Sequence, residues 1–192
     1  MKKYFKLPTK SDLKGRSSTI SNAFTIAITP YVYPSKEEID EFYKKLQIAK
    51  GQCAYCLGKA NAMDHIKPLV TNGLPTGYIT EIHNLVPCCS ACNSSKGKKE
   101  FVDWYKSDNN KERLMDEGLT EEDIEKRYEI ISDYIKEIGE PINYPEILGA
   151  DLWQEFLERK QAMLHSLKDN QKFCDELCKI IANKLHQGES KK

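Results

Sequence analysis

Cys53-Ala54-Tyr55-Cys56 and Cys89-Ser90-Ala91-Cys92 decide how this chain folds, because each short stretch can place two thiolates on one metal ion. Four thiolates in tetrahedral geometry favour Zn²⁺. The 32 residues between the two pairs exceed the spacing of a simple zinc ribbon and contain turn signals. We therefore expect a small β-hairpin between the cysteine pairs, followed by a helix that begins near Ser90.

The remaining cysteines need separate interpretations. Cys88 could replace Cys89 as a ligand, but only Cys89 restores the two-residue gap to Cys92, so Cys89 is preferred. Cys174 and Cys178 are one turn apart on a helical stretch with apolar neighbours, and this pattern predicts two thiols buried in the core. A redox pair, or cysteines that act only as small apolar residues, is the alternative to the metal site.

Composition limits the class of protein. A chain of 192 residues with 40% hydrophobic and 30% charged residues can bury a core without disulfides, and its longest apolar stretch is too short to span a bilayer. The basic N-terminus is followed by no apolar signal region, and seven cysteines with close pairs favour metal binding in a reducing compartment. We expect a cytoplasmic protein that does not associate with membranes.

The net charge is zero, but the charges are unevenly distributed. Residues 1–30 hold six basic and one acidic side chain, residues 31–100 hold nine and seven, and residues 101–192 hold fourteen and twenty-one. A basic N-terminal half could face a phosphate backbone, while the acidic half limits non-specific adhesion. A solvated acidic helical surface with no such role is the alternative.

The chain divides into three expected parts: a basic N-terminal segment with a helix (1–50), a zinc module (51–107) and a helical C-terminal region (108–192). Residues 1–34 are compatible with helix or strand. Capping-box patterns at Ser35 and Thr120 predict helices over 36–49 and 120–138. Two further helices are expected, over residues 151–168 and 171–186.

Polar residues lie within the zinc module in three groups: Asp64-His65-Ile66-Lys67-Pro68, Asn84-Leu85-Val86-Pro87 and Cys92-Asn93-Ser94-Ser95-Lys96-Gly97. In order and spacing they resemble the HNH nuclease family, in the branch of ββα-metal endonucleases that has a four-cysteine zinc site. The resemblance covers about residues 51–105. It implies an α+β fold in which a zinc-anchored ββα-metal module is flanked by an N-terminal segment and a mainly helical C-terminal region.

The resemblance also implies roles for four residues. Asp64 would bind the catalytic metal, His65 would deprotonate the attacking water, and Asn84 would fix the hairpin loop and so orient the base. Asn93 stands at the last motif position, where many members have histidine, and would be the second metal ligand. One carboxylate and one amide oxygen form a hard, weakly binding site, which favours Mg²⁺ or Mn²⁺. Cys53, Cys56, Cys89 and Cys92 would hold a structural zinc ion.

Three further residues are candidate substrate contacts. Lys96 lies one helical turn after Asn93, and with Ser95 it could contact the scissile phosphate or a neighbouring one. His83, next to Asn84, could touch substrate or face solvent. The resemblance implies hydrolysis of phosphodiester bonds in DNA that leaves 5′-phosphate and 3′-hydroxyl ends, and we expect a restriction-type enzyme.

Other readings stay open. Cleavage of duplex DNA requires a cut in each of its two strands, so one active site per chain fits either a homodimer or sequential nicking. A phage or mobile-element nuclease of low specificity, a nuclease that acts on RNA, and a non-catalytic zinc-finger module that binds nucleic acid are the alternatives. The intact set of Asp64, His65, Asn84 and Asn93 argues against the non-catalytic module, because a protein that only binds has no chemical need for it.

Overall fold

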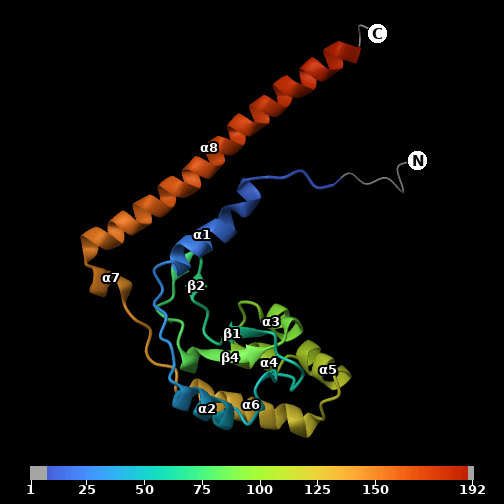
Figure 1. Ribbon diagram of the computed structural model, residues 1–192, viewed down its shortest axis with the longest axis vertical. Coiled ribbons are helices and arrows are strands. Elements are labelled where there is room, and N and C mark those ends of the chain that lie inside the picture. The colour runs from blue at the N-terminus through green and yellow to red at the C-terminus, as the bar shows by residue number, and fades with distance from the viewer. Residues whose placement is uncertain (1–7, 190–192) are drawn as a thin grey trace. The chain divides into compact units, whose positions relative to one another are not determined.

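The computed structural model describes residues 8–189 and divides into two compact units, one of residues 28–143 and one of residues 8–27 with 144–189 (Figure 1). The unit of residues 28–143 contains α2 (Lys36–Lys45), β1 (Ala62–His65), β2 (Val70–Thr71), β3 (Leu74–Pro75), η2 (Ile82–Asn84), β4 (Leu85–Cys88), α3 (Ser90–Lys96), α4 (Phe101–Tyr105), α5 (Asp108–Asp116) and α6 (Glu121–Ile135). The other unit contains η1 (Lys14–Arg16), α1 (Ser17–Ile26), α7 (Tyr144–Leu148) and α8 (Ala150–Glu189).

The centre of the unit of residues 28–143 is a ββα arrangement. β1 pairs antiparallel with β4 in a register that runs from Ala62 opposite Cys88 to His65 opposite Leu85, and α3 follows directly (Figure 1). The loop between the two strands carries the short β2–β3 hairpin. The expected hairpin between the cysteine pairs and the expected helix beginning near Ser90 are therefore confirmed, as is the α+β class.

Aromatic side chains from α4 build the core beside the first cysteine pair. Trp104 and Tyr105 are fully buried, and both rings pack against the ring of Tyr55. The hydroxyl of Tyr105 donates to the backbone carbonyl of Tyr55 at 2.9 Å, and Arg127 of α6 donates to the carbonyl of Ala54 at 2.9 Å. Helices on both sides of the expected boundary at residue 107 thus hold the zinc module, and the compact unit extends to residue 143.

Both expected helix starts are confirmed. Ser35 and Glu38 form a reciprocal capping box at the start of α2, and Thr120 and Asp123 form one at the start of α6. Each helix is shorter than expected at its C-terminal end. After α2, Gln47 adopts a positive φ of 49°, which ends the helical path before residue 49.

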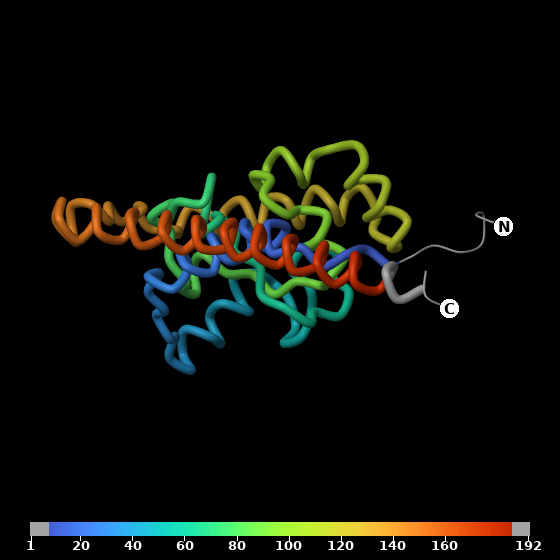
Figure 2. Tube along the Cα trace, turned by 90° about the horizontal axis from the view of Figure 1, so that it is seen from above, coloured from blue at the N-terminus to red at the C-terminus, as the bar shows by residue number. Residues whose placement is uncertain are grey.

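The other unit is helical throughout its described core. Residues 1–34 were ambiguous in sequence, and the structure forms α1 there, whose Phe24 stacks on Phe156 of α8. The two helices expected over 151–168 and 171–186 are one continuous helix, α8 (Figure 2). No proline or glycine interrupts residues 151–186, so the change of pattern near residue 170 does not end the helix.

The expectation that Cys174 and Cys178 are buried was wrong, since both are exposed on α8. Helical spacing of apolar residues predicts which side of a helix is apolar, but it does not supply an element to cover that side. Within the described residues, no helix has the length and apolar character needed to cross a bilayer.

Candidate active site and zinc centre

The two cysteine pairs converge on one point. The Sγ atoms of Cys53, Cys56, Cys89 and Cys92 all lie within 4.8 Å of one another, and those of Cys56 and Cys89 are 3.7 Å apart. Four sulfurs at about 2.3 Å from a tetrahedral Zn²⁺ are separated by about 3.8 Å, so the cluster fits this ion closely. The donor set is all thiolate and has no open position, as in structural zinc sites.

Cys88 lies outside this cluster, and Cys89 belongs to it. The side chain of Cys88 is fully buried at the end of β4, and burial, with smaller contributions from nearby acidic groups, raises the pKa of its thiol to about 12. A thiol of this kind stays protonated at neutral pH. Cys89 instead caps α3, where its Sγ accepts the backbone N–H of Cys92 at 3.4 Å.

Asp64 and His65 are neighbours near the end of β1, so their side chains leave the strand on opposite faces. Asp64 is buried, and His65 is partly buried. Nε2 of His65 lies 3.0 Å from Oγ1 of Thr80, which fixes the plane of the ring. Burial lowers the pKa of His65, the charge of Asp64 opposes this shift, and the charge of Lys96 adds to it.

Asn84 is fully buried and connects the two ends of the loop between β1 and β4. Its Oδ1 accepts the backbone N–H of Lys67 at 2.8 Å, and its Nδ2 donates to the carbonyls of Lys67 and Ile79 at 3.2 and 3.1 Å. The backbone carbonyl of Asn84 accepts the N–H of Ile66 at 3.0 Å. The loop that carries Thr80 is therefore held next to His65 by one amide side chain.

Lys96 lies in a different place from the one expected for a phosphate contact. It is 2% exposed, and its Nζ is 3.0 Å from Oδ2 of Asp64 and donates to the backbone carbonyl of His65 at 3.0 Å. The hydroxyl of Tyr55 donates to the same Oδ2 at 2.7 Å. Two buried donors thus hold one oxygen of the Asp64 carboxylate, and Oδ1 has no hydrogen-bond partner within residues 8–189.

Asn93 lies one turn before Lys96 on α3, so the two side chains share a helix face. Because Lys96 reaches Asp64, this face of α3 is turned toward the carboxylate. The amide of Asn93 is partly exposed and has no hydrogen-bond partner in the described part of the chain. Ser95 lies on another side of the helix, where its Oγ accepts the indole N–H of Trp104 at 3.0 Å.

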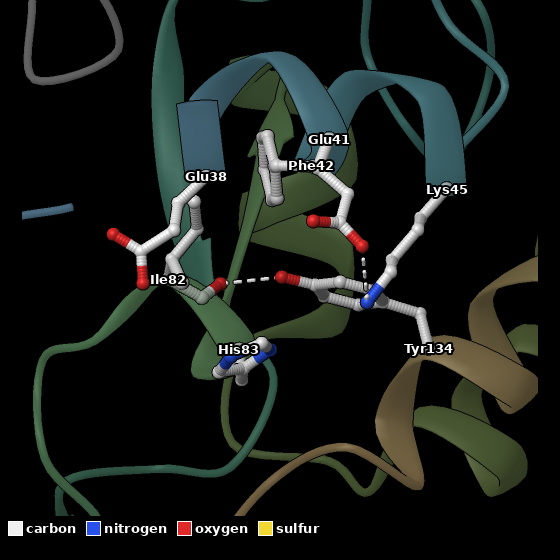
Figure 3. Close-up of a pocket in the computed structure, with 7 residues that line it drawn as sticks. All are labelled: Glu38, Glu41, Phe42, Lys45, Ile82, His83 and Tyr134. Carbon is white, nitrogen blue, oxygen red and sulfur yellow. Dashed lines mark hydrogen bonds and ion pairs between the residues drawn. The ribbon is translucent and has the colours of Figure 1, made fainter. Parts of the chain in front are cut away.

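His83 lies in a separate pocket between α2 and α6 (Figure 3). Its Nδ1 is 3.3 Å from Oε2 of Glu137, and the pocket wall also carries Glu38 and Glu41 beside Lys45. The pocket is lined by Glu38, Glu41, Phe42, Lys45, Ile82, His83 and Tyr134. A wall with several carboxylates repels phosphate, so the surroundings of His83 do not favour a substrate contact.

Sequence reasoning missed three residues of the site. Tyr55 lies between the two cysteines of the first pair, Thr80 lies in the loop, and Arg113 of α5 donates from Nη2 to Sγ of Cys92 at 3.3 Å. Only the place of Tyr55 could have been predicted from the sequence, since a residue between the two cysteines of a metal-binding pair must lie close to the site. Thr80 and Arg113 act through contacts with residues distant in sequence, which no local pattern encodes.

Comparison with known proteins agrees with this geometry. Residues 53–99 match the family described as HNH endonuclease, a match that spans about a quarter of the chain and includes all four cysteines of the cluster. No curated protein and no solved structure gives a significant match to the chain. Residues 53–99 are therefore similar to the HNH endonuclease domain. A domain of this family indicates nuclease activity on nucleic acid.

Proposed function

We propose that the protein is a metal-dependent endonuclease that hydrolyses phosphodiester bonds of duplex DNA as a restriction-type enzyme. The observation that carries the proposal is the fixed ring of His65, held by Thr80, next in sequence to a carboxylate that two buried donors orient. Hydrolysis of a phosphodiester needs a base for water, charge stabilisation at phosphorus and a stabilised leaving oxygen. The site offers residues for each of these tasks.

His65 would act as the general base. In the tautomer that donates from Nε2 to Oγ1 of Thr80, Nδ1 keeps its lone pair and can take the proton of the attacking water. Burial lowers the pKa of His65. The imidazole is therefore neutral, and able to accept a proton, at the pH of the cell.

Asp64 and Asn93 would hold the divalent cation. Oδ1 of Asp64 and Oδ1 of Asn93 are hard oxygen donors on facing elements, and neither has another partner among the described residues. Such a donor pair fits Mg²⁺ or Mn²⁺ better than a softer transition metal. When bound, the ion supplies Lewis-acid stabilisation of the phosphate oxygens and of the leaving 3′ oxygen.

Lys96 and Tyr55 take positioning roles in this proposal. Their bonds to Oδ2 of Asp64 orient the carboxylate so that Oδ1 remains for the cation. The zinc centre is architectural, because its ligands flank Tyr55 on one side and precede Asn93 on the other. Thiolate-bound zinc would thereby fix both the partner of Asp64 and the start of α3.

The test compares His65→Ala with His165→Ala, an exposed histidine on α8. With Mg²⁺, the protein is expected to convert a supercoiled plasmid into discrete linear fragments, and EDTA is expected to stop the reaction. His65→Ala should abolish cleavage while zinc content and thermal stability stay unchanged, and His165→Ala should cleave normally.

Other results would redirect the proposal. Cleavage that survives in His65→Ala refutes the assignment of the base. A smear instead of fragments favours a nuclease of low specificity, and preferential cleavage of a matched RNA duplex replaces DNA as the substrate. Sedimentation of the His65→Ala protein on a short duplex distinguishes a homodimer from a monomer that nicks each strand in turn.

A further inference from the structure

The carboxylate of Asp64 already has a counter-charge of its own. Its side chain is 8% exposed, that of Lys96 is 2% exposed, and the two charged atoms are 3.0 Å apart. A buried ammonium at this distance neutralises a carboxylate far more completely than a surface lysine does, because water does not screen the pair. Asp64, the only charged ligand of the proposed cation site, therefore belongs to a pair with little net charge.

The surrounding groups do not restore negative charge. The amide of Asn93 and the phenol of Tyr55 carry no charge. Lys67, at the start of the loop, is paired with Glu100 at 2.8 Å. The side chains around the site thus sum to about zero charge.

The negative charge of the zinc centre is partly offset by two arginines. A zinc ion with four thiolates carries two negative charges, and two buried or half-buried guanidinium groups lie against its ligand segments. Arg113 donates to Sγ of Cys92, and Arg127 donates to the carbonyl of Ala54 between two ligand residues. Arg113 is also paired with Glu117, so the two guanidinium groups offset only part of the negative charge of the centre.

We propose that the divalent cation and the nucleic acid bind to this site cooperatively, because a phosphodiester must supply the negative charge that Lys96 removes from Asp64. This inference rests on the proposed function and goes beyond it, since it concerns how the site assembles. A doubly charged ion must give up part of its hydration shell to bind protein oxygens, and two oxygens without net charge stabilise it little in return. Mg²⁺ in particular usually takes part of its ligands from substrate phosphates. The free protein binds the ion weakly, and the complex with duplex binds it well.

Linkage makes the effect reciprocal. If a duplex strengthens binding of the cation by a given factor, the cation strengthens binding of the duplex by the same factor. Lys96 sets the size of this factor, because it determines how much charge the phosphate must contribute. Lys96 is then a positioning residue that acts through Asp64 and does not touch the substrate.

The first experiment measures Mn²⁺ binding by the loss of the free-ion paramagnetic resonance signal. The His65→Ala protein is titrated with Mn²⁺ alone and with a saturating duplex, after subtraction of binding to the duplex itself. We expect the duplex to strengthen binding by at least about ten-fold, and Mn²⁺ to strengthen duplex binding equally. Equal affinity with and without duplex overturns the proposal.

The second experiment removes the counter-charge in the same background. Lys96→Met leaves the Asp64 carboxylate unneutralised, so the free protein should bind Mn²⁺ at least about ten-fold more tightly, with a smaller gain from the duplex. Tyr55→Phe removes the other bond to Oδ2 without changing charge, and Lys99→Met removes an exposed lysine near the end of α3. Neither should tighten Mn²⁺ binding in the free protein to the same extent.

A thermal measurement accompanies the titrations. Lys96→Met should melt below the parent without Mn²⁺ and gain more from added Mn²⁺ than the parent does, which a loss of packing alone would not produce. If Lys96→Met does not fold, the titration of the His65→Ala protein with Mn²⁺, with and without duplex, tests the proposal by itself. Failure of plasmid cleavage by the unaltered protein refutes the proposed function. Normal cleavage with no cooperativity refutes only this inference.

Discussion

The guanidinium of Arg113 donates from Nη2 to Sγ of Cys92 across 3.3 Å, which links α5 to the four-cysteine cluster. Oδ1 of Asn110 accepts from the same Nη2 at 2.8 Å and holds the group in place. Arg113 lies outside the matched family segment, which ends at residue 99. The helical region after that segment therefore contributes directly to the metal centre.

Arg113→Met should accelerate loss of zinc. The methionine keeps the apolar stem but removes the donor that stabilises the charged thiolate, and partners of this kind are worth about ten- to hundred-fold in metal affinity. Zinc transfer to a chromogenic chelator measures the rate. Arg159→Met, in an exposed ion pair on α8, is the control and should release zinc at the unaltered rate. Equal rates in both variants would show that the contact does not stabilise the centre.

Cys89→Ala and Cys88→Ala should behave differently although they are neighbours. Cys89 belongs to the sulfur cluster, so its loss should abolish stoichiometric zinc and unfold the module. Cys88 is a buried neutral thiol outside the cluster, and its loss should cost on the order of 1 kcal/mol of stability with zinc retained. Metal analysis and thermal unfolding of both variants check this, and zinc loss in Cys88→Ala would contradict it.

Thr80→Val should lower the rate of cleavage more than the affinity for DNA. Valine keeps the shape of threonine but cannot accept the hydrogen bond from Nε2 of His65, so the ring is no longer held in one orientation. We expect kcat to fall about ten- to hundred-fold with little change in KM. Steady-state cleavage of a labelled duplex measures both values. Thr71→Val, exposed in the same loop, should cleave normally, and an equal loss there would indicate a general disturbance of the loop.

Gly77→Ala and Gly118→Ala separate backbone strain from steric conflict. Both glycines have almost the same positive φ, 95° and 96°. A Cβ at Gly77 would lie 2.5 Å from the carbonyl oxygen of Ile142, whereas a Cβ at Gly118 would meet no atom within 4 Å. Gly118→Ala should cost about 1–2 kcal/mol, and Gly77→Ala about 1–3 kcal/mol more. Chemical denaturation measures both, and equal costs would show that the loop yields freely.

The local features of this fold could be predicted from sequence. The two cysteine pairs, the hairpin between them and the capping boxes at Ser35 and Thr120 depend on residues a few positions apart or on a fixed metal geometry. The exposure of Cys174 could not be predicted, because helical periodicity carries no information about which elements cover a helix. The apolar periodicity is weak near residue 170 and so predicts two helices, whereas the structure has the single helix α8.

The electrostatic features were the least predictable. Lys96 belongs to a run of lysines that reads as a solvated helix end, yet it is buried because Asp64, 32 positions earlier, lies opposite α3. Arg127 lies at helical spacing from Ile124 and Ile131 on the buried face of α6, but a single sequence does not show that two backbone carbonyls there accept from its guanidinium. In each case a partner from a distant element determines the position, and a single sequence does not specify that partner.

The exposed thiols of α8 also have a practical consequence. Cys174 and Cys178 are open to solvent, whereas Cys53, Cys56, Cys88 and Cys92 are buried and Cys89 belongs to the metal cluster. A maleimide fluorophore will react first on α8, so the native chain can be labelled outside residues 53–99 without removing any other cysteine. Loading of the protein onto DNA can then be followed by fluorescence with its zinc ligands intact.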